Sequence, residues 1–469
     1  MTVPAKVLRA VASFALLLPV CGFAPNPSQK IGADVIVTAA PAYEPLAAIR
    51  SEERFPKGAQ LLLLHDGKAE PLVGNFAATA DANVSFDAKK VLFSGKKSAS
   101  DAWQIWELTL ENHVVRQLTT SQQDAIHPIY LPEGRMVYAL RTPQGFQLEA
   151  ERTDSAEKIQ GENNSGNSTI LPLTYLHASA VPVDVLADGR ILFEAGFPLG
   201  SGAVPELFLV YSDGSGVESY RCDHGTAPAK GRWGGKQLAS GDVVFTHGGS
   251  LARFTSPLAH EERIAAPHAE YAGAIAETAS GAWLVSARSA SSMPYTLKLW
   301  KAGAAASETV YARNGENLVE PVLLAPRNRP RRHPSALHDW DYANLLALDA
   351  RISRDGALQG VPVAVRLEMQ DAAGRAVAMG TAPVEKDGSF FVKAPPDNPI
   401  RFALLDEKGS VLRQEHGWFW IRRGEQRICV GCHAGPERAS ENHVPAVLLR
   451  TTTPVDVTGA AQRPLPGGN

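Results

Sequence analysis

One short pattern returns five times between residues 60 and 324: a turn rich in Gly, Asp or Lys, followed by a β-branched or aromatic strand. The strand centres of successive copies are 45, 55, 52 and 40 residues apart, at Val91, Met136, Ile191, Val243 and Trp283. Four-stranded propeller blades repeat at this spacing. We therefore expect an all-β chain built on a six- or seven-bladed β-propeller, in which the opening segment 60–72 contributes to a sixth blade. An array of two-layer β-sandwiches is the competing architecture.

Changes in composition divide the chain beyond these repeats. Pro and Arg alternate in Pro326 to Pro334 (PRNRPRRHP), a stretch that favours neither a strand nor a helix. Short strands of period 2 follow it, separated by turns, as in a small β-sandwich. The sequence thus predicts a propeller over residues 50–325, a linker over 326–340, a sandwich-like middle domain over 341–417 and a C-terminal segment over 418–469.

The first 24 residues have the layout of an export signal. Lys6 and Arg9 precede the apolar run Ala10 to Val20, which is shorter than the ~20 apolar residues of a membrane-spanning helix. A buried N-terminal helix is the alternative, but nothing polar along the run gives it an amphipathic face. Cys21 stands where a bacterial lipoprotein carries its acylated cysteine. Lipidation of Cys21, with a membrane tether, and plain cleavage near Ala24 both remain open, and either gives a periplasmic or extracytoplasmic protein.

Composition and charge exclude one class of partner. The 40 Gly and 33 Pro residues indicate many turns rather than long helices. The formal net charge is −3, and the basic residues are scattered rather than gathered into a stripe. We therefore expect no binding to nucleic acid.

Near the C-terminus, Cys429, Cys432 and His433 form the motif C-x-x-C-H (ICVGCHAG), the spacing used for c-type haem attachment. Two thiols add to the two vinyl groups of the porphyrin, and the adjacent imidazole binds the iron as the proximal ligand. A redox disulfide would need a thioredoxin-like setting, and a zinc site would need a second ligand pair, for which Cys222 and His224 are the candidate. Coincidence is the third alternative. Because the export signal directs the chain to the compartment where bacteria attach haem, we expect one haem c on Cys429 and Cys432.

The motif leaves the sixth iron position open. His443, ten residues after His433, is our first choice as distal ligand, with His416 and His338 as alternatives and Met379 as a remote option. Two strong axial ligands would make a low-spin electron carrier, whereas an open position would permit ligand binding or catalysis.

Other residues near the motif have two interpretations each. The aromatic run Trp418 to Trp420 would cover a porphyrin face or belong to a strand core. Three cations would pair with haem propionates or lie on a solvated edge: Arg422, Arg423 and Arg427. Cys222 has no partner cysteine in the mature chain, and we expect it to be buried.

Long segments resemble the hydrazine synthase alpha subunit and its bacterial relatives. They are EPVLLAPRNRP, DYANLLALDAR, DGSFFVKAPPDNPIRFALLDEKG and GWFWIRRGEQRICVGCHAGPE, and the propeller turns also resemble those of TolB-type propellers. The resemblance implies a propeller, a middle β-domain and a C-terminal haem-bearing part. It also implies an alpha subunit that works with haem on hydroxylamine or nitric oxide and ammonia. Only Cys429, Cys432 and His433 match a haem motif in this chain, whereas the synthase has more than one haem. We therefore expect its architecture and haem attachment, but not hydrazine synthesis.

These observations predict an exported monohaem c-type cytochrome that acts in electron transfer. Its propeller would dock a redox partner protein, and residues 418–469 would form the haem-binding segment. One alternative is a haem enzyme acting on a small nitrogen or oxygen species. The other is a non-catalytic periplasmic propeller scaffold.

Overall fold

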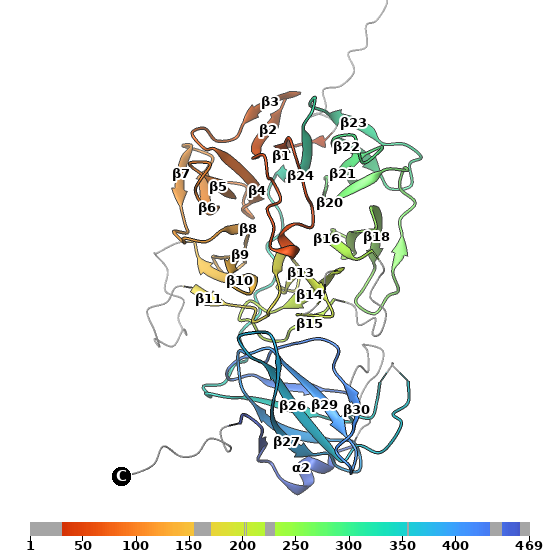
Figure 1. Cartoon of the computed structure of the whole chain (residues 1–469). Coiled ribbons are helices and arrows are strands. Elements are labelled where there is room, and N and C mark those ends of the chain that lie inside the picture. Colours follow the sequence, from red (N-terminus) through yellow and green to blue (C-terminus); the bar gives the residue numbers. More distant parts are fainter. Residues whose placement is uncertain are drawn as a thin grey trace, which may run out of the picture.

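The computed structural model describes residues 31–153, 170–200, 202, 204–220, 230–353, 356–431 and 443–459. They form two lobes: a ring of six four-stranded sheets, in the upper part of Figure 1, and a smaller lobe of two four-stranded sheets below it. Helix in these residues is limited to one 3-10 turn and one short α-helix. No helix among them is long and apolar enough to cross a membrane. The expected all-β class and the propeller are confirmed.

Each blade is an antiparallel sheet, and the strands of each run outward from the innermost in the order that follows. Blade 1 is β24 (Asn317–Leu324), β1 (Asp34–Ala40), β2 (Gln60–His65) and β3 (Lys68–Pro71). Blade 2 is β4 (Ala78–Val84), β5 (Lys90–Lys96), β6 (Gln104–Thr109) and β7 (Val114–Gln117), and blade 3 is β8 (Ala125–Tyr130), β9 (Arg135–Thr142), β10 (Gly145–Arg152) and β11 (Ile170–Pro172). Blade 4 is β12 (Ala180–Val185), β13 (Ile191–Phe197), β14 (Val204–Val210) and β15 (Glu218–Ser219). Blade 5 is β16 (Arg232–Gln237), β17 (Val243–His247), β18 (Ser250–Phe254) and β19 (Glu262–Arg263), and blade 6 is β20 (Glu270–Glu277), β21 (Ala282–Arg288), β22 (Thr296–Lys301) and β23 (Glu308–Tyr311).

Blade 1 closes the ring with strands from both ends of the propeller sequence. β24 follows blade 6 in the chain, yet it pairs antiparallel with β1, from Asp34 opposite Leu324 to Ala40 opposite Asn317. The ring therefore has six blades. Apolar side chains fill the spaces between neighbouring blades; Phe245 of β17, for example, shares a buried cluster with Leu192 of β13.

All six innermost strands are interrupted by a β-bulge, seen as a shift of register against the next strand. Three consecutive blades place a polar residue at this bulge in the left-handed region: Glu320 (φ 57°), Asp81 (φ 59°) and His127 (φ 54°). Blades 5 and 6 use Gly234 and Gly273 there instead. Residues other than glycine rarely adopt this conformation, and a bulge redirects its side chain. In this ring the bulges turn the polar side chains into a chamber along the axis.

The connection between β1 and β2 closes one end of the axis. Residues 41–59, which include the 3-10 turn η1 (Ala48–Arg50), lie over the centre of the ring in Figure 1. Ala48 and Phe55 of this connection belong to a buried cluster with side chains from the surrounding blades: Trp103, Phe146, Val181 and Tyr295. This apolar contact fixes the connection as a plug.

The linker passes the other end of the axis. Residues 326–340 contain no helix or strand. The amide of Arg327 donates to the carbonyl of Phe86 over 3.0 Å, and the amide of Arg331 donates to the carbonyl of Ala187 over 2.9 Å. The linker is therefore held against the turns of blades 2 and 4.

The smaller lobe is a β-sandwich. One sheet has the order β31 (Gln426–Cys429), β25 (Ala343–Ala347), β28 (Phe390–Ala394), β32 (Val455–Asp456), and the other β27 (Ala376–Pro383), β26 (Ala364–Gln370), β29 (Ile400–Leu405), β30 (Val411–Gln414). β31 and β32 pair in parallel with β25 and β28. Both come from residues 418–469, so this segment is built into the sandwich. Helix α2 (Ala446–Arg450) packs on the outer face through Val447.

Residues 418–427 join the two lobes. Trp420 is fully buried in a cluster with blades 3 and 4, and its Nε1 donates to the carbonyl of Gly214 over 2.9 Å. Arg422 donates to Asp397 over 2.7 Å and also contacts the hydroxyl of Tyr175. The segment that precedes the C-x-x-C-H motif is thus fixed between the propeller and the sandwich.

Candidate functional site

The axial chamber of the propeller has a volume of about 830 Å³. The plug lines one end with Tyr43, Ile49 and Arg54, and the linker lines the other with Pro326 and Arg327. The innermost strands supply walls that are largely apolar, among them Val84, Ile129, Val181, Ile275 and Val322. Polar groups gather at the level of the bulges.

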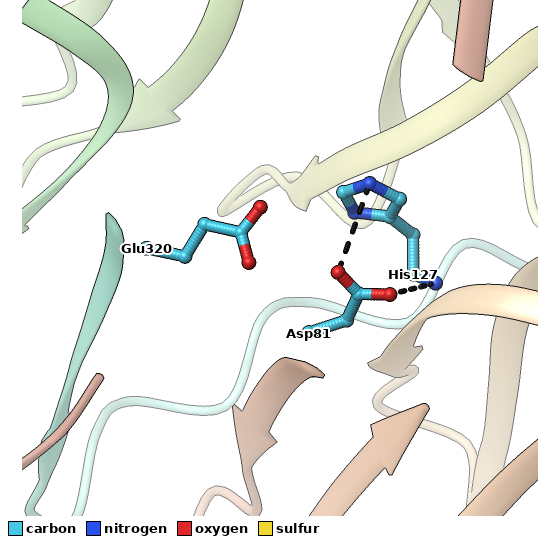
Figure 2. Close-up of side chains that lie close together, drawn as sticks. All are labelled: Asp81, His127 and Glu320. Atoms are coloured by element: carbon cyan, nitrogen blue, oxygen red, sulfur yellow. Dashed lines mark hydrogen bonds and ion pairs between the residues drawn. The ribbon is translucent and has the colours of Figure 1, made fainter. Parts of the chain in front are cut away.

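Asp81, His127 and Glu320 converge there, as Figure 2 shows. Arg54 of the plug contacts all three: Nη1 donates to Asp81 Oδ1 over 2.7 Å and contacts His127 Nε2, and Nη2 contacts Glu320 Oε1. Asp81 Oδ2 accepts from Ser94 Oγ over 2.7 Å and from the amide of His127 over 3.1 Å. A guanidinium can only donate, so His127 Nε2 is the acceptor in its contact with Arg54.

Burial and neighbouring charges shift the pKa values of these groups in different directions. Burial opposes ionisation of Asp81, but His127, Arg54 and the hydrogen bond from Ser94 hold its pKa well below the ordinary value. Burial, reinforced by Arg54, lowers the pKa of His127 to about 3, so the imidazole is neutral. Burial raises the pKa of Glu320 to about 7, despite the nearby Arg54. At neutral pH, Asp81 and Arg54 form the fixed ion pair.

The donor atoms of Asp81, His127 and Glu320 lie within 4.8 Å of one another, close enough to bind one metal ion. Carboxylate and imidazole ligands suit several divalent metals. Arg54, however, bonds to all three side chains. The cation of this cluster is therefore the guanidinium.

Glu194 is a further carboxylate of the chamber. It lies on β13, is only 6% exposed, and accepts from the amide of Gly234 through Oε1. Among the described residues, its Oε2 has no hydrogen-bond partner. Burial raises its pKa to about 7, although Gly234 and Arg54 oppose this. The chamber thus contains a carboxylate with one free oxygen.

The haem motif begins at the end of β31. Cys429 lies opposite Ala347 of β25 and packs, partly buried, against the sandwich core. Burial raises the pKa of its thiol, and Arg427 opposes this. Cys432 and His433 lie outside the described residues, as do Cys21, Cys222 and residues 1–24, where the sequence predicts an export signal.

The surroundings of Cys429 fit a haem group in two respects. Ile428 is 58% exposed, so apolar surface lies beside the motif. Arg427 Nη1 is buried without a hydrogen-bond partner among the described residues, and Glu425 Oε1 is 3.9 Å from it. An apolar surface next to a guanidinium with one unsatisfied nitrogen suits a porphyrin with its propionates. Gly431 leaves no room for a side chain, because a Cβ would lie 2.9 Å from the carbonyl oxygens of Asp349 and Ile352.

His443 lies at the same end of the sheet as Cys429. Its Nε2 is 3.5 Å from Asp387 Oδ2, and Asp387 shortly precedes β28, whose Phe390 lies opposite Ala347. Two strand spacings therefore separate Cys429 from Phe390, about 10 Å. His416 is exposed after β30 in the other sheet. His338 is exposed and stacks on Trp340 before β25, at the opposite end of the sheet.

The other residues near the motif have structural partners. Trp418 and Trp420 are buried, and Phe419 packs in the clusters of both lobes, so the aromatic run forms core rather than a porphyrin wall. Arg422 is held by Asp397, and burial lowers its pKa to about 10. Of the three arginines, Arg427 is the one with a buried unsatisfied nitrogen.

Sequence reasoning missed the axial cluster, although it left a signal. His127 and Glu320 each precede a proline inside an apolar strand (IHPIY and VEPVLL). Proline within a strand marks a bulge or an edge. The same strand position in neighbouring repeats would have grouped these residues.

Three comparisons relate the chain to known proteins. Residues 347–434 match the family model of the hydrazine synthase alpha subunit middle domain. Hydrazine synthase subunit alpha of Kuenenia stuttgartiensis is 24% identical over 32% of this chain and 25% of that protein, so the aligned part spans a quarter of the relative's length.

Solved structures extend the likeness to most of the fold. Kuenenia stuttgartiensis hydrazine synthase superposes with a TM-score of 0.77 and 18% identity, over 89% of this chain and 71% of that chain. TolB from Acinetobacter baumannii matches with a TM-score of 0.43 and 12% identity, over 62% of this chain and 66% of that one. The chain is therefore similar in fold to hydrazine synthase, and its residues 347–434 are similar to the middle domain of the alpha subunit.

Proposed function

We propose that this protein is an exported monohaem c-type cytochrome that transfers electrons, with one haem c bound through Cys429 and Cys432 and His433 as the proximal iron ligand. The position of Cys429 carries the proposal. It ends an edge strand of the sandwich, beside exposed Ile428 and the unsatisfied Arg427 nitrogen. The match of residues 347–434 to the synthase middle domain, which includes the whole motif, supports it.

The chain's own residues would hold the group and tune it. Haem supplies one-electron chemistry at its iron. Cys429 and Cys432 anchor it covalently, and Arg427 compensates propionate charge. The packing of Trp420 against the propeller fixes the approach of the chain to the motif. The propeller then serves as the docking platform for a redox partner protein.

The first experiment measures covalent haem. Protein produced in a host with c-type maturation machinery, and exported by its own signal, should gain the mass of one haem and show the reduced α-band. The double variant Cys429→Ser/Cys432→Ser should lose both, whereas Cys222→Ser should keep them. A wild-type protein without the added mass would refute the proposal. The mature N-terminus from the same mass spectrum tests lipidation of Cys21.

A haem enzyme acting on a small nitrogen or oxygen species is the second candidate, favoured by the likeness to hydrazine synthase. It requires an open iron position, whereas His443 as distal ligand would close it. A low-spin spectrum that becomes high-spin in His443→Ala supports electron transfer. A high-spin wild type that binds added ligand supports the enzyme instead. Haem-free protein that still binds its partner would point to a scaffold.

A further inference from the structure

The axial chamber has the size and lining of a ligand site. Small-molecule sites are concave spaces of about 300–1,000 Å³, mostly apolar, with a few placed polar groups. The chamber, at about 830 Å³, fits this description, with apolar walls such as Ile275 and Val322 and a polar level at the bulges. It is larger than a bare ion needs, so an organic ligand fills it best.

Glu194 forms no ion pair among the described residues. Arg54 is paired with Asp81 and contacts Glu320. Of the other two cations of the lining, Lys236 donates to Asp184 over 2.7 Å, and Arg327 donates to the backbone carbonyl of Val84 over 3.2 Å. Glu194 is left without a cation of its own.

The position of the Glu194 side chain is fixed by its surroundings. Its strand, β13, pairs without a register shift with β14, and the amide of Gly234 fixes Oε1. Oε2 is the free acceptor. A buried carboxylate is stabilised most by a partner that brings both a positive charge and hydrogen-bond donors. A metal ion is disfavoured, since Arg54 occupies the cluster that offers the metal-binding geometry.

We propose that the chamber binds an organic cation, a primary ammonium group on an apolar body, with the ammonium donating to Glu194 Oε2 and the apolar body lying against the chamber walls. This site is separate from the haem motif and does not depend on the proposed electron transfer.

The test uses the full-length protein as purified and hexylammonium chloride as probe, with 1-hexanol as its uncharged counterpart. Isothermal titration should show one hexylammonium site, weakened at least tenfold by Glu194→Gln. Glutamine keeps the size of the side chain and the acceptor for Gly234. Glu277, another carboxylate of the lining, accepts from the amide of Ala239, and Glu277→Gln is the matched control, which should change affinity less than twofold. Hexanol should bind wild type and Glu194→Gln equally.

A second variant tests the location. Ala274→Leu narrows the chamber and leaves all its carboxylates in the sequence, and should weaken the binding of hexylammonium while circular dichroism stays that of wild type. The proposal is overturned if hexylammonium does not bind, or if Glu194→Gln leaves its affinity unchanged. It is also overturned if Glu194→Gln abolishes binding of Zn²⁺ or Mn²⁺, which would make Glu194 a metal ligand.

Discussion

Replacing Glu194 with Gln should stabilise the propeller increasingly as the pH rises from about 4.5 to about 7. The pKa of Glu194 rises from an ordinary value of 4.5 to about 7 because the side chain is buried. The folded protein therefore holds a proton on Glu194 between those two pH values, whereas the unfolded chain releases it. Stability then falls as the pH rises through this range and levels off above it. Each pKa unit corresponds to about 1.4 kcal/mol, so ionising Glu194 costs up to about 3 kcal/mol.

Glutamine resembles the protonated acid and still accepts from Gly234. Near pH 5 the free energies of unfolding of the variant and wild type should therefore differ by less than about 1 kcal/mol, and at pH 8 the variant should be more stable by up to about 3 kcal/mol. Glu320, whose pKa is also raised to about 7, titrates in both proteins, so the difference between them reports Glu194.

The assay is urea unfolding at pH 5, 6, 7 and 8, with hydrogen exchange of β12 and β16 identifying the propeller transition. Glu277→Gln, which removes another carboxylate of the chamber lining, is measured alongside as the control. Parallel pH profiles for wild type and Glu194→Gln, or a variant less stable at pH 8, would refute the reasoning that burial leaves this carboxylate without a compensating cation.

Two further variants test the plug and the lobe contact. Arg54→Ala leaves Asp81 and Glu320 buried without their cation and should cost about 3–5 kcal/mol of unfolding free energy. The control, Arg50→Ala at an exposed ion pair, should cost less than ~0.5 kcal/mol. Equal losses of the two variants by calorimetry would contradict the buried pairing. Trp420→Ala empties a fully buried site between the lobes and should cost about 3–5 kcal/mol. Limited proteolysis should then cut within residues 326–340 faster than in wild type, and an unchanged rate would argue against the contact.

The repeat spacing was enough to predict the propeller, because the sequence of each blade contains its own copy of the turn and strand. Blade 1, which closes the ring, was harder to predict from the sequence. Its innermost strand, β24, lies far along the chain from β1, and a spacing argument cannot pair distant strands. The expected sandwich also formed, but β31 and β32 joined it from residues that have little strand periodicity. Both are short strands paired in parallel, and such pairing depends on tertiary neighbours more than on local pattern.

The two sites differ in how much the sequence reveals. The spacing of Cys429 and Cys432 is a local chemical signature and needs no fold to be recognised. The axial cluster instead combines Arg54, Asp81, His127 and Glu320 from distant positions, and only ring closure brings them together. The aromatic run at Trp420 could be interpreted from the sequence as a porphyrin wall or as strand core. The hydrogen bond from Trp420 to Gly214 shows that it belongs to the core.

The closing strand also has a consequence for synthesis. β1 begins at Asp34, but its partner β24 ends at Leu324, so the edge of β1 stays unpaired until almost the whole propeller has been made. Val35, Ile36 and Val37 are buried in the finished ring. An unpaired apolar strand edge invites pairing with other chains. A nascent or truncated chain lacking Asn317–Leu324 would therefore expose the unpaired edge of β1 to other chains. This topology thus requires that the unfinished ring be protected from such pairing during translation and export.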